Sequence, residues 1–256
     1  MRSPSAPTAG PIVLFDLDGT VLTFDDPPPG PGRTAMDRAI ASLYGVADAS
    51  AGVRFSGGTD RGIVRALLRK CGLDDAAING EAERTLDRYL EHLAELLRTR
   101  RYRAMGDVAG AVAELAADGA CVGVATGNVR AGARLKLDSA GLGAVFDLDR
   151  GGYGCDAEPR PDILRAALAR CAAAVGRRSS SSGASAVAHA SAVVVVGDTV
   201  HDVTAARAIG ARVVGVALGP DARRELLDAR ADVVVDDCGP ALVAAIRALD
   251  LTSPRS

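Results

Sequence analysis

The sequence predicts an α/β protein with a doubly wound, Rossmann-like parallel sheet and an all-helical cap inserted after the first strand. Three features of the chain lead to this prediction. A short apolar segment lies near the N-terminus, three helical segments without a strand follow it, and strands and helices alternate after residue 106. Because parallel strands need crossovers between them, this alternation indicates a parallel sheet with helices on its faces.

The first strand is expected at residues 12–15, where four apolar residues are too few for a helix but suit a buried parallel strand. The segment at 25–32 is rich in proline and glycine, so we expect a stiff, non-helical connection out of that strand. These features divide the chain. We expect residues 1–23 to be core, with a disordered tail at 1–10, residues 24–104 to form the helical cap, and residues 105–256 to complete the core.

Apolar residues recur at helical spacing through the cap, as at Ile63, Leu67 and Leu68, and predict helices at 33–44, 59–71 and 79–101. The core after the cap should then contain helices at 108–118, 131–140, 161–175, 203–209, 222–229 and 240–249. Its strands should lie at 121–125, 145–148, 193–196, 212–217 and 232–235. A low-complexity, Ser-rich stretch at 176–191 is predicted to be a flexible loop.

The composition excludes several classes of protein. With 30 basic and 32 acidic residues the net charge is −2, so the chain lacks the basic surplus typical of a nucleic-acid-binding protein. No apolar run approaches the roughly 18 residues of a membrane-spanning helix, and the first ten residues lack the apolar core of a signal peptide. We therefore expect neither a nucleic-acid nor a membrane partner. No two of the five cysteines have CxxC spacing, so we expect ordinary thiols in a cytoplasmic protein, a monomer or homodimer whose partner is a small molecule.

Three polar clusters follow predicted strands, at the edge where open α/β sheets place their sites. In the first, Asp16 and Asp18 are two residues apart on an extended chain, so their carboxylates should face the same side. Like charges this close repel each other unless a cation or a proton lies between them. The alternative is an ordinary Asp- and Gly-rich turn after a strand.

The second cluster is Thr126, Gly127 and Asn128, which follow the predicted strand at 121–125. A hydroxyl and backbone N–H groups at the start of a helix can bind an anion such as phosphate. Taken alone, however, Thr or Asn before a helix is more often an N-cap.

The third cluster places Asp198 at the end of an all-valine strand and Asp202 four residues later, at the start of a helix. The two carboxylates could bind a metal ion, or they could be a capping pair favoured by the helix dipole. His201 lies between them, but a single histidine is a weak signal for a metal site and is expected to be solvated or outside the ligand set.

In this order, FDLDGTVL, ATGN and VVGDTVHD resemble the motifs of the haloacid dehalogenase superfamily, over most of residues 11–220. The helical insert after the first motif is similar to the helical-cap branch, which includes phosphoglycolate-phosphatase-like enzymes. The resemblance implies Asp16 as the nucleophile and Asp18 as the general acid and base. It also implies that Thr126 holds the phosphoryl group and that Asp198 and Asp202 complete a metal site.

One departure from the family concerns the lysine usually found ahead of the fourth strand, often in a KPxPD-like string. This chain reads DAEPRPD there, so strict register places Glu158 in the lysine position. We prefer Arg160 as the cation, although it could also be a solvated residue at a helix start. The chain has only two lysines, and neither Lys70 in the cap nor Lys136 in the following helix is expected to take this role.

A phosphate dianion can approach several carboxylates only if cations neutralise them, and hard oxygen ligands select Mg²⁺. We assign Asp16, Asp198 and the backbone carbonyl of Asp18 as direct metal ligands, with Asp202 bound directly or through water. Thr126, Gly127, Asn128 and Arg160 are expected to bind the substrate, with Asp16, Asp18, Thr126 and Arg160 acting in catalysis. In the cap, Gly58 and Thr59 are candidate substrate contacts, or simply a turn before a capped helix.

The predicted function is hydrolysis of a small phosphorylated metabolite through an aspartyl-phosphate. Asp18 should hold its proton to higher pH than an isolated Asp, because its neighbours are negatively charged. A phosphomutase with the same Asp pair is the main alternative. A metal-free dehalogenase is disfavoured because Asp18 is present, and a catalytically idle binding module is disfavoured because every motif residue is intact.

Overall fold

The computed structural model describes residues 10–25, 27–179 and 193–251. The predicted disordered tail at 1–10 therefore lies almost entirely outside the described residues, as does most of the predicted Ser-rich loop. Residues 176–179 of that loop belong instead to the end of a helix, α6 (Arg160–Ser179). Within the described ranges, no helix combines the length and apolar composition needed to cross a bilayer.

Five parallel strands form the central sheet, in the order β4-β1-β5-β6-β7. They are β1 (Ile12–Phe15), β4 (Cys121–Val124), β5 (Val193–Gly197), β6 (Arg212–Val216) and β7 (Val233–Val235). In register, Ile12 pairs with Cys121 on one side and with Val193 on the other. The parallel, doubly wound sheet predicted from the sequence is therefore confirmed, with the first strand between β4 and β5.

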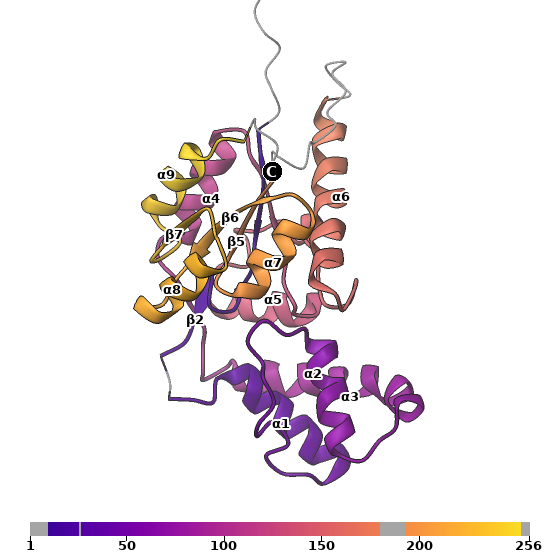
Figure 1. Ribbon diagram of the computed structural model, residues 1–256. Coiled ribbons are helices and arrows are strands. Elements are labelled where there is room, and N and C mark those ends of the chain that lie inside the picture. The colour runs from indigo at the N-terminus through magenta and orange to yellow at the C-terminus, as the bar shows by residue number, and fades with distance from the viewer. Residues whose placement is uncertain (1–9, 26, 180–192, 252–256) are drawn as a thin grey trace, which may run out of the picture.

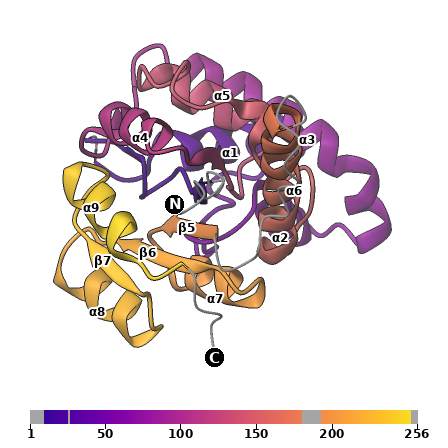
Figure 2. The same ribbon diagram turned by 90° about the horizontal axis from the view of Figure 1, so that it is seen from above.

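Alternate residues of each strand point to opposite faces of the sheet and build two apolar cores. Val13 and Phe15 pack with α4 (Val108–Ala117) and α9 (Pro240–Ala248), whereas Ile12 and Leu14 pack with α6 and α7 (Val200–Ala208). Figure 2 shows these helix pairs on opposite sides of the strands. Helices α5 (Arg130–Ser139) and α8 (Pro220–Asp228) complete the alternation.

Three helices lie between β1 and β4 in the sequence and are grouped together beyond the carboxyl end of the sheet (Figure 1). They are α1 (Pro31–Tyr44), α2 (Asp60–Lys70) and α3 (Asp75–Leu96), and α3 packs against both of the others. The third helix begins four residues before the predicted start because the Asp74 side chain accepts a hydrogen bond from the N–H of Ala77 and caps it. This cap therefore forms a largely separate helical layer over the edge of the sheet that carries the polar clusters.

Two elements differ from the sequence prediction. A short antiparallel pair, β2 (Leu22–Thr23) with β3 (Arg103–Ala104), joins the two connections between core and cap and was not predicted. The strand predicted at 145–148 is wrong, since residues Leu148–Arg150 form a 3-10 turn capped by the Asp147 side chain. The apolar residue Phe146 belongs to the core although no strand forms here. Its ring packs edge-on against Phe15, with 5.6 Å between the two ring centroids.

Candidate active site

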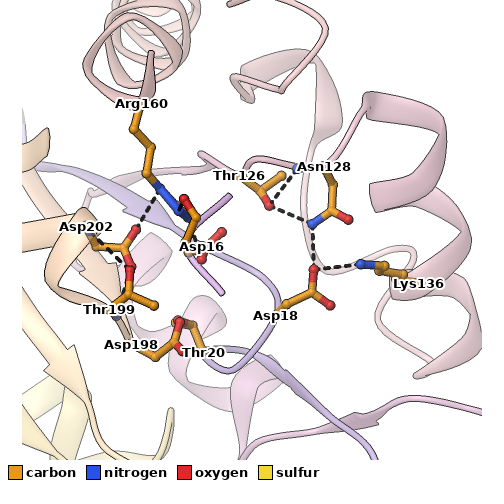
Figure 3. A network of polar contacts seen from close by, with 11 residues as sticks. Asp16, Asp18, Thr20, Thr126, Asn128, Lys136, Arg160, Asp198, Thr199 and Asp202 are labelled. Carbon is orange, nitrogen blue, oxygen red and sulfur yellow. Dashed lines mark hydrogen bonds and ion pairs between the residues drawn. The ribbon is translucent and has the colours of Figure 1, made fainter. Parts of the chain in front are cut away.

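The three polar clusters meet at the carboxyl edge of the sheet, as the sequence predicted. Asp16 follows β1, Thr126 lies two residues after the end of β4, and Asp198 follows β5. Since β1 lies between β4 and β5, the side chains that follow these three neighbouring strands face one another (Figure 3). Gly19 permits the turn after β1: its φ is +83°, and a β-carbon there would lie 2.3 Å from a carboxylate oxygen of Asp198.

Asp16, Asp198 and Asp202 form an acidic cluster whose candidate ligand oxygens all lie within 4.8 Å of one another. Asp16 and Asp202 are 5% and 3% exposed. Burial, followed by repulsion from Asp16 and Asp202, raises the pKa of Asp198 to about 8. Burial raises the pKa of Asp16 to about 6, and Arg160 opposes that rise. The cluster therefore holds more negative charge than its surroundings neutralise, and its all-oxygen donor set fits a hard divalent cation.

The carboxylate of Asp18 is not part of this cluster. It contacts Lys136 and Asn128 on the other side of the site, so a side-chain role for Asp18 as a metal ligand has no support in the geometry. His201 is exposed and also lies outside the cluster, in agreement with the sequence analysis.

Arg160, at the start of α6, is the cation beside the cluster. Its Nη2 lies 2.8 Å from Asp16 Oδ2 and its Nε lies 3.1 Å from Asp202 Oδ1. Burial lowers the pKa of the guanidinium, but Asp16 and Asp202 outweigh this effect and raise that pKa above its ordinary value. Glu158, the residue in strict register, instead forms an ion pair with Arg65 of the cap. The structure thus places the preferred residue, Arg160, in the site.

Asp202 has two partners, which explains why its two interpretations were hard to separate. Its Oδ2 accepts hydrogen bonds from the N–H of Thr199 at 3.0 Å and from the Thr199 hydroxyl at 2.6 Å, which caps α7. Its Oδ1 faces Arg160. Thr20, which the sequence analysis did not single out, donates to Asp198 Oδ1 at 3.0 Å and orients that carboxylate.

The second cluster does not cap α5, because the N-cap residue is Val129, which lacks a capping side chain. Instead, Asn128 Nδ2 donates to Thr126 Oγ1 at 2.8 Å and to Asp18 Oδ2 at 2.7 Å. The Thr126 hydroxyl therefore acts as an acceptor toward Asn128 and keeps its own proton available for a ligand oxygen. Asn128 Oδ1 is buried and has no hydrogen-bond partner within the described residues.

Lys136 is the functional residue that the sequence analysis missed. Its Nζ lies 2.7 Å from Asp18 Oδ2, and the lysine side chain is only 6% exposed. Burial lowers the pKa of this ammonium, but Asp18 and neighbouring tyrosines raise it well above its ordinary value. One sequence signal could have identified it. Lys136 is three and four residues after Ala133 and Gly132, which places it on the same, buried face of α5.

This ammonium also corrects the expected ionisation of Asp18. Burial raises the pKa of Asp18, but Lys136 and Asn128 outweigh it, so the pKa lies below its ordinary value rather than above it. The sequence analysis counted the acidic neighbours of Asp18 and lacked the cation that the fold brings to it.

The cap meets the core at the start of α2. The side chain of Thr59 accepts a hydrogen bond from the N–H of Gly62 and caps that helix, whereas Gly58 borders the site. Asp60 donates its backbone N–H to the carbonyl of Gly127 at 2.8 Å, and its Oδ2 accepts the N–H of Val129 at 2.8 Å. A β-carbon at Gly127 would lie 2.3 Å from the carbonyl oxygen of Gly58, so only glycine allows this approach.

Between core and cap lies a cavity of about 320 Å³, a size suited to a small molecule. Polar groups of the core line one part of it: Asp16, Asp18, Thr126, Asn128, Lys136, Arg160 and Asp198. Apolar and aromatic side chains line the rest: Phe24, Met36, Phe55, Ile63, Tyr89 and Tyr102.

A parallel α/β domain with an acidic cluster at its carboxyl edge and a helical cap above it defines a class of capped hydrolytic enzymes. Residues 11–210 match the family model of haloacid dehalogenase-like hydrolases, and the chain belongs to that family. The chain is therefore an enzyme of the hydrolase class.

Three individual proteins are similar to the chain. The probable phosphatase IndB of Dickeya dadantii (strain 3937) is 29% identical over 252 residues, which are 95% of this chain and 96% of the relative. A hydrolase from Pseudomonas syringae has a TM-score of 0.64 and 21% identity, covering 95% of this chain and 99% of its own. CbbY from Rhodobacter sphaeroides, solved in complex with phosphate, has the same TM-score and identity, over 91% and 98%.

Proposed function

We propose that the protein is a phosphatase that hydrolyses a small phosphate monoester through a phosphorylated Asp16. The observation that carries this proposal is the position of Asp16, whose buried carboxylate borders the cavity with the Arg160 guanidinium 2.8 Å from one of its oxygens. A guanidinium at this point can hold a phosphoryl oxygen next to the attacking carboxylate and stabilise the charge that develops during transfer.

In the first step, a carboxylate oxygen of Asp16 forms a bond to phosphorus as the ester bond between phosphorus and the leaving oxygen breaks. Arg160, the Thr126 hydroxyl and backbone N–H groups of the loop after β1 would hold the phosphoryl oxygens during this step. The products of the step are the acyl phosphate on Asp16 and the free alcohol.

Asp18 supplies the proton that the leaving oxygen needs. Beside Lys136 this carboxyl is ionised before substrate arrives, but a phosphate dianion adds negative charge, raises its pKa and lets it take up a proton from solvent. After giving up its proton, Asp18 takes one from the water that attacks phosphorus, which releases phosphate and restores Asp16.

Asp16, Asp198 and Asp202 are the residues that would hold a magnesium ion, with the backbone carbonyl of Asp18 as a further candidate ligand. When bound, Mg²⁺ would neutralise the surplus negative charge of the cluster and polarise a phosphoryl oxygen. The name of the relative from Dickeya dadantii and the phosphate bound to CbbY support a phosphoryl substrate for this chain as well.

The proposal is tested by hydrolysis of p-nitrophenyl phosphate by the purified protein. We expect turnover with Mg²⁺, no turnover with excess EDTA, and no turnover by Asp16→Asn, whose amide cannot accept the phosphoryl group. A tenth or more of wild-type kcat in Asp16→Asn would rule out the covalent route. Conservation of total phosphate ester during incubation with a sugar phosphate would instead identify a phosphomutase.

A further inference from the structure

Half of the aromatic residues of the chain surround one cavity. The chain contains four Phe, four Tyr and no Trp. Phe24, Phe55, Tyr89 and Tyr102 line the cavity between cap and core, and Met36 and Ile63 complete its apolar part. Such a concentration in an aromatic-poor protein indicates that the cavity is built to hold an apolar group.

The ring of Phe55 is held in place although it lies in a loop. Arg33, on α1, donates hydrogen bonds to the carbonyls of Ser50 and Val53 at 2.8 and 3.0 Å, on the segment that leads to Phe55. The same guanidinium lies 4.0 Å from the centroid of the Phe55 ring. The charge and hydrogen bonds of Arg33 thus fix a planar aromatic surface at the cavity.

The second aromatic surface lies next to the reacting groups. Tyr102 is 5% exposed, and its ring packs edge-on against Phe24 with 6.1 Å between centroids. Lys136 Nζ lies 5.5 Å from the centroid of the Tyr102 ring and 2.7 Å from Asp18. Any alcohol whose oxygen is protonated by Asp18 therefore has Tyr102 as a near neighbour.

We propose that the natural substrate is a phosphate monoester whose leaving group carries a planar aromatic ring, bound between the phosphoryl-transfer residues and the aromatic side chains of the cap. This inference rests on the proposed phosphatase function. The phosphoryl group lies at Asp16 and Arg160, and the ring extends past Asp18 toward Tyr102 and Phe55. Aromatic pairs prefer edge-on or offset geometry and contribute more than equal apolar area.

The test compares two esters of primary alcohols, benzyl phosphate and propyl phosphate, with the Mg²⁺-loaded protein. We expect kcat/KM to be at least about tenfold higher for benzyl phosphate. Phe55→Leu should reduce this preference by about fivefold, within the range of one aromatic contact. Phe146→Leu makes the same change at a buried ring outside the cavity and should leave the preference unaltered.

Equal kcat/KM for the two esters, or a preference that Phe55→Leu does not reduce, would overturn the inference. If neither ester is hydrolysed, turnover of p-nitrophenyl phosphate still tests the proposed function, and equilibrium dialysis of benzylphosphonate against propylphosphonate decides the inference separately. Tighter binding of benzylphosphonate that depends on Phe55 would support an aromatic ligand without phosphatase activity. Equal or undetectable binding of both would overturn the inference as well.

Discussion

Arg160 and Lys136 divide the positive charge of the site between the two carboxylates of the first motif. The guanidinium contacts Asp16, and the ammonium contacts Asp18. The two aspartates are only two residues apart in sequence, yet the pKa of Asp16 is raised to about 6 while that of Asp18 is lowered. This difference places Asp16 in the part of the site with surplus negative charge, which a bound cation would neutralise, and keeps Asp18 beside a lysine that favours its ionised form.

Replacing Arg160 by Ala should lower kcat/KM by about 10²–10³-fold, the usual cost of removing one preorganised charge at a transition state. Arg160→Lys should recover part of this loss, because the positive charge is kept although the fork of donors is not. Steady-state kinetics on p-nitrophenyl phosphate measure both effects. Arg165→Ala, five residues further along α6 at a side chain that is 56% exposed, is the control and should be close to wild type. Near-normal activity in Arg160→Ala would contradict the assignment.

Lys136→Met should lower kcat by at least about tenfold at neutral pH, since the acid–base group loses the cation that orients it. The pKa of Asp18 should rise in the variant, so the remaining activity should shift its pH profile to higher pH. Lys70→Met removes the other lysine, which donates to the carbonyl of Ala49 at 2.8 Å on the cap, and should leave the profile unchanged. An unshifted profile in Lys136→Met would show that the ion pair is only structural.

The element that couples cap to core is the N-terminus of α2. Asp60 is 7% exposed and bonds to the loop that carries Thr126, while Arg160 Nη1 donates to the carbonyl of Gly57 at 3.3 Å. The loop that carries Thr126 and the guanidinium of Arg160 therefore both contact the same turn of the cap. Cap position and catalytic geometry are linked through these few contacts.

The Asp60 carboxyl should make stability depend on pH. Burial raises its pKa from 3.8 to about 6, so between these values the folded state keeps a proton that the unfolded state has lost. Its contribution to stability is therefore lost as pH rises through this window. Relative to wild type, Asp60→Asn should gain up to about 3 kcal/mol in unfolding free energy between pH 4 and pH 7.

Urea unfolding at the two pH values measures this difference. Asp75→Asn is the control, because that carboxyl is 73% exposed on the cap and should give no comparable change. If the difference in unfolding free energy between Asp60→Asn and wild type does not change with pH, the pKa of Asp60 is not raised on folding.

Elements with strong periodicity were predictable, and short or context-dependent ones were not. Four successive valines specify a buried strand, and the leucines of α2 specify a helix at nearly the observed bounds. The two-residue strands β2 and β3 are too short to show periodicity. Each forms by pairing with the other, at the two connections between core and cap. The apolar residues at 145–148 matched a strand, but a capped turn and core packing determine their structure.

At the scale of the whole molecule, the sheet topology explains how much of the site could be predicted. Motifs at the ends of predicted parallel strands must share one edge, and the strand order β4-β1-β5 then places Asp16, Thr126 and Asp198 on neighbouring strands. The position of Lys136 depends on how α5 packs against this edge, and the aromatic cavity depends on how the cap is placed. Neither follows from local sequence, because both arise from contacts between distant segments.

Metal binding should be visible in the stability of the entire chain. A ligand that binds only the folded state at 100 times its Kd adds about 2.7 kcal/mol. Saturating Mg²⁺ should therefore raise the Tm of the EDTA-treated protein by several degrees in scanning calorimetry. Asp198→Asn should lose most of this increase, whereas Asp236→Asn, at a side chain that is 84% exposed, should keep it. No increase in the wild type would argue against a metal site in this cluster.

The most direct test of the account is chemical trapping of the phosphorylated aspartate. Protein mixed with Mg²⁺ and p-nitrophenyl phosphate is quenched in acid, reduced with borohydride, which converts an acyl phosphate to an alcohol, and digested for mass spectrometry. The account predicts homoserine at position 16 in the wild type and none in Asp16→Asn. Trapping at a different residue, or phosphate release without modification of Asp16, would contradict it.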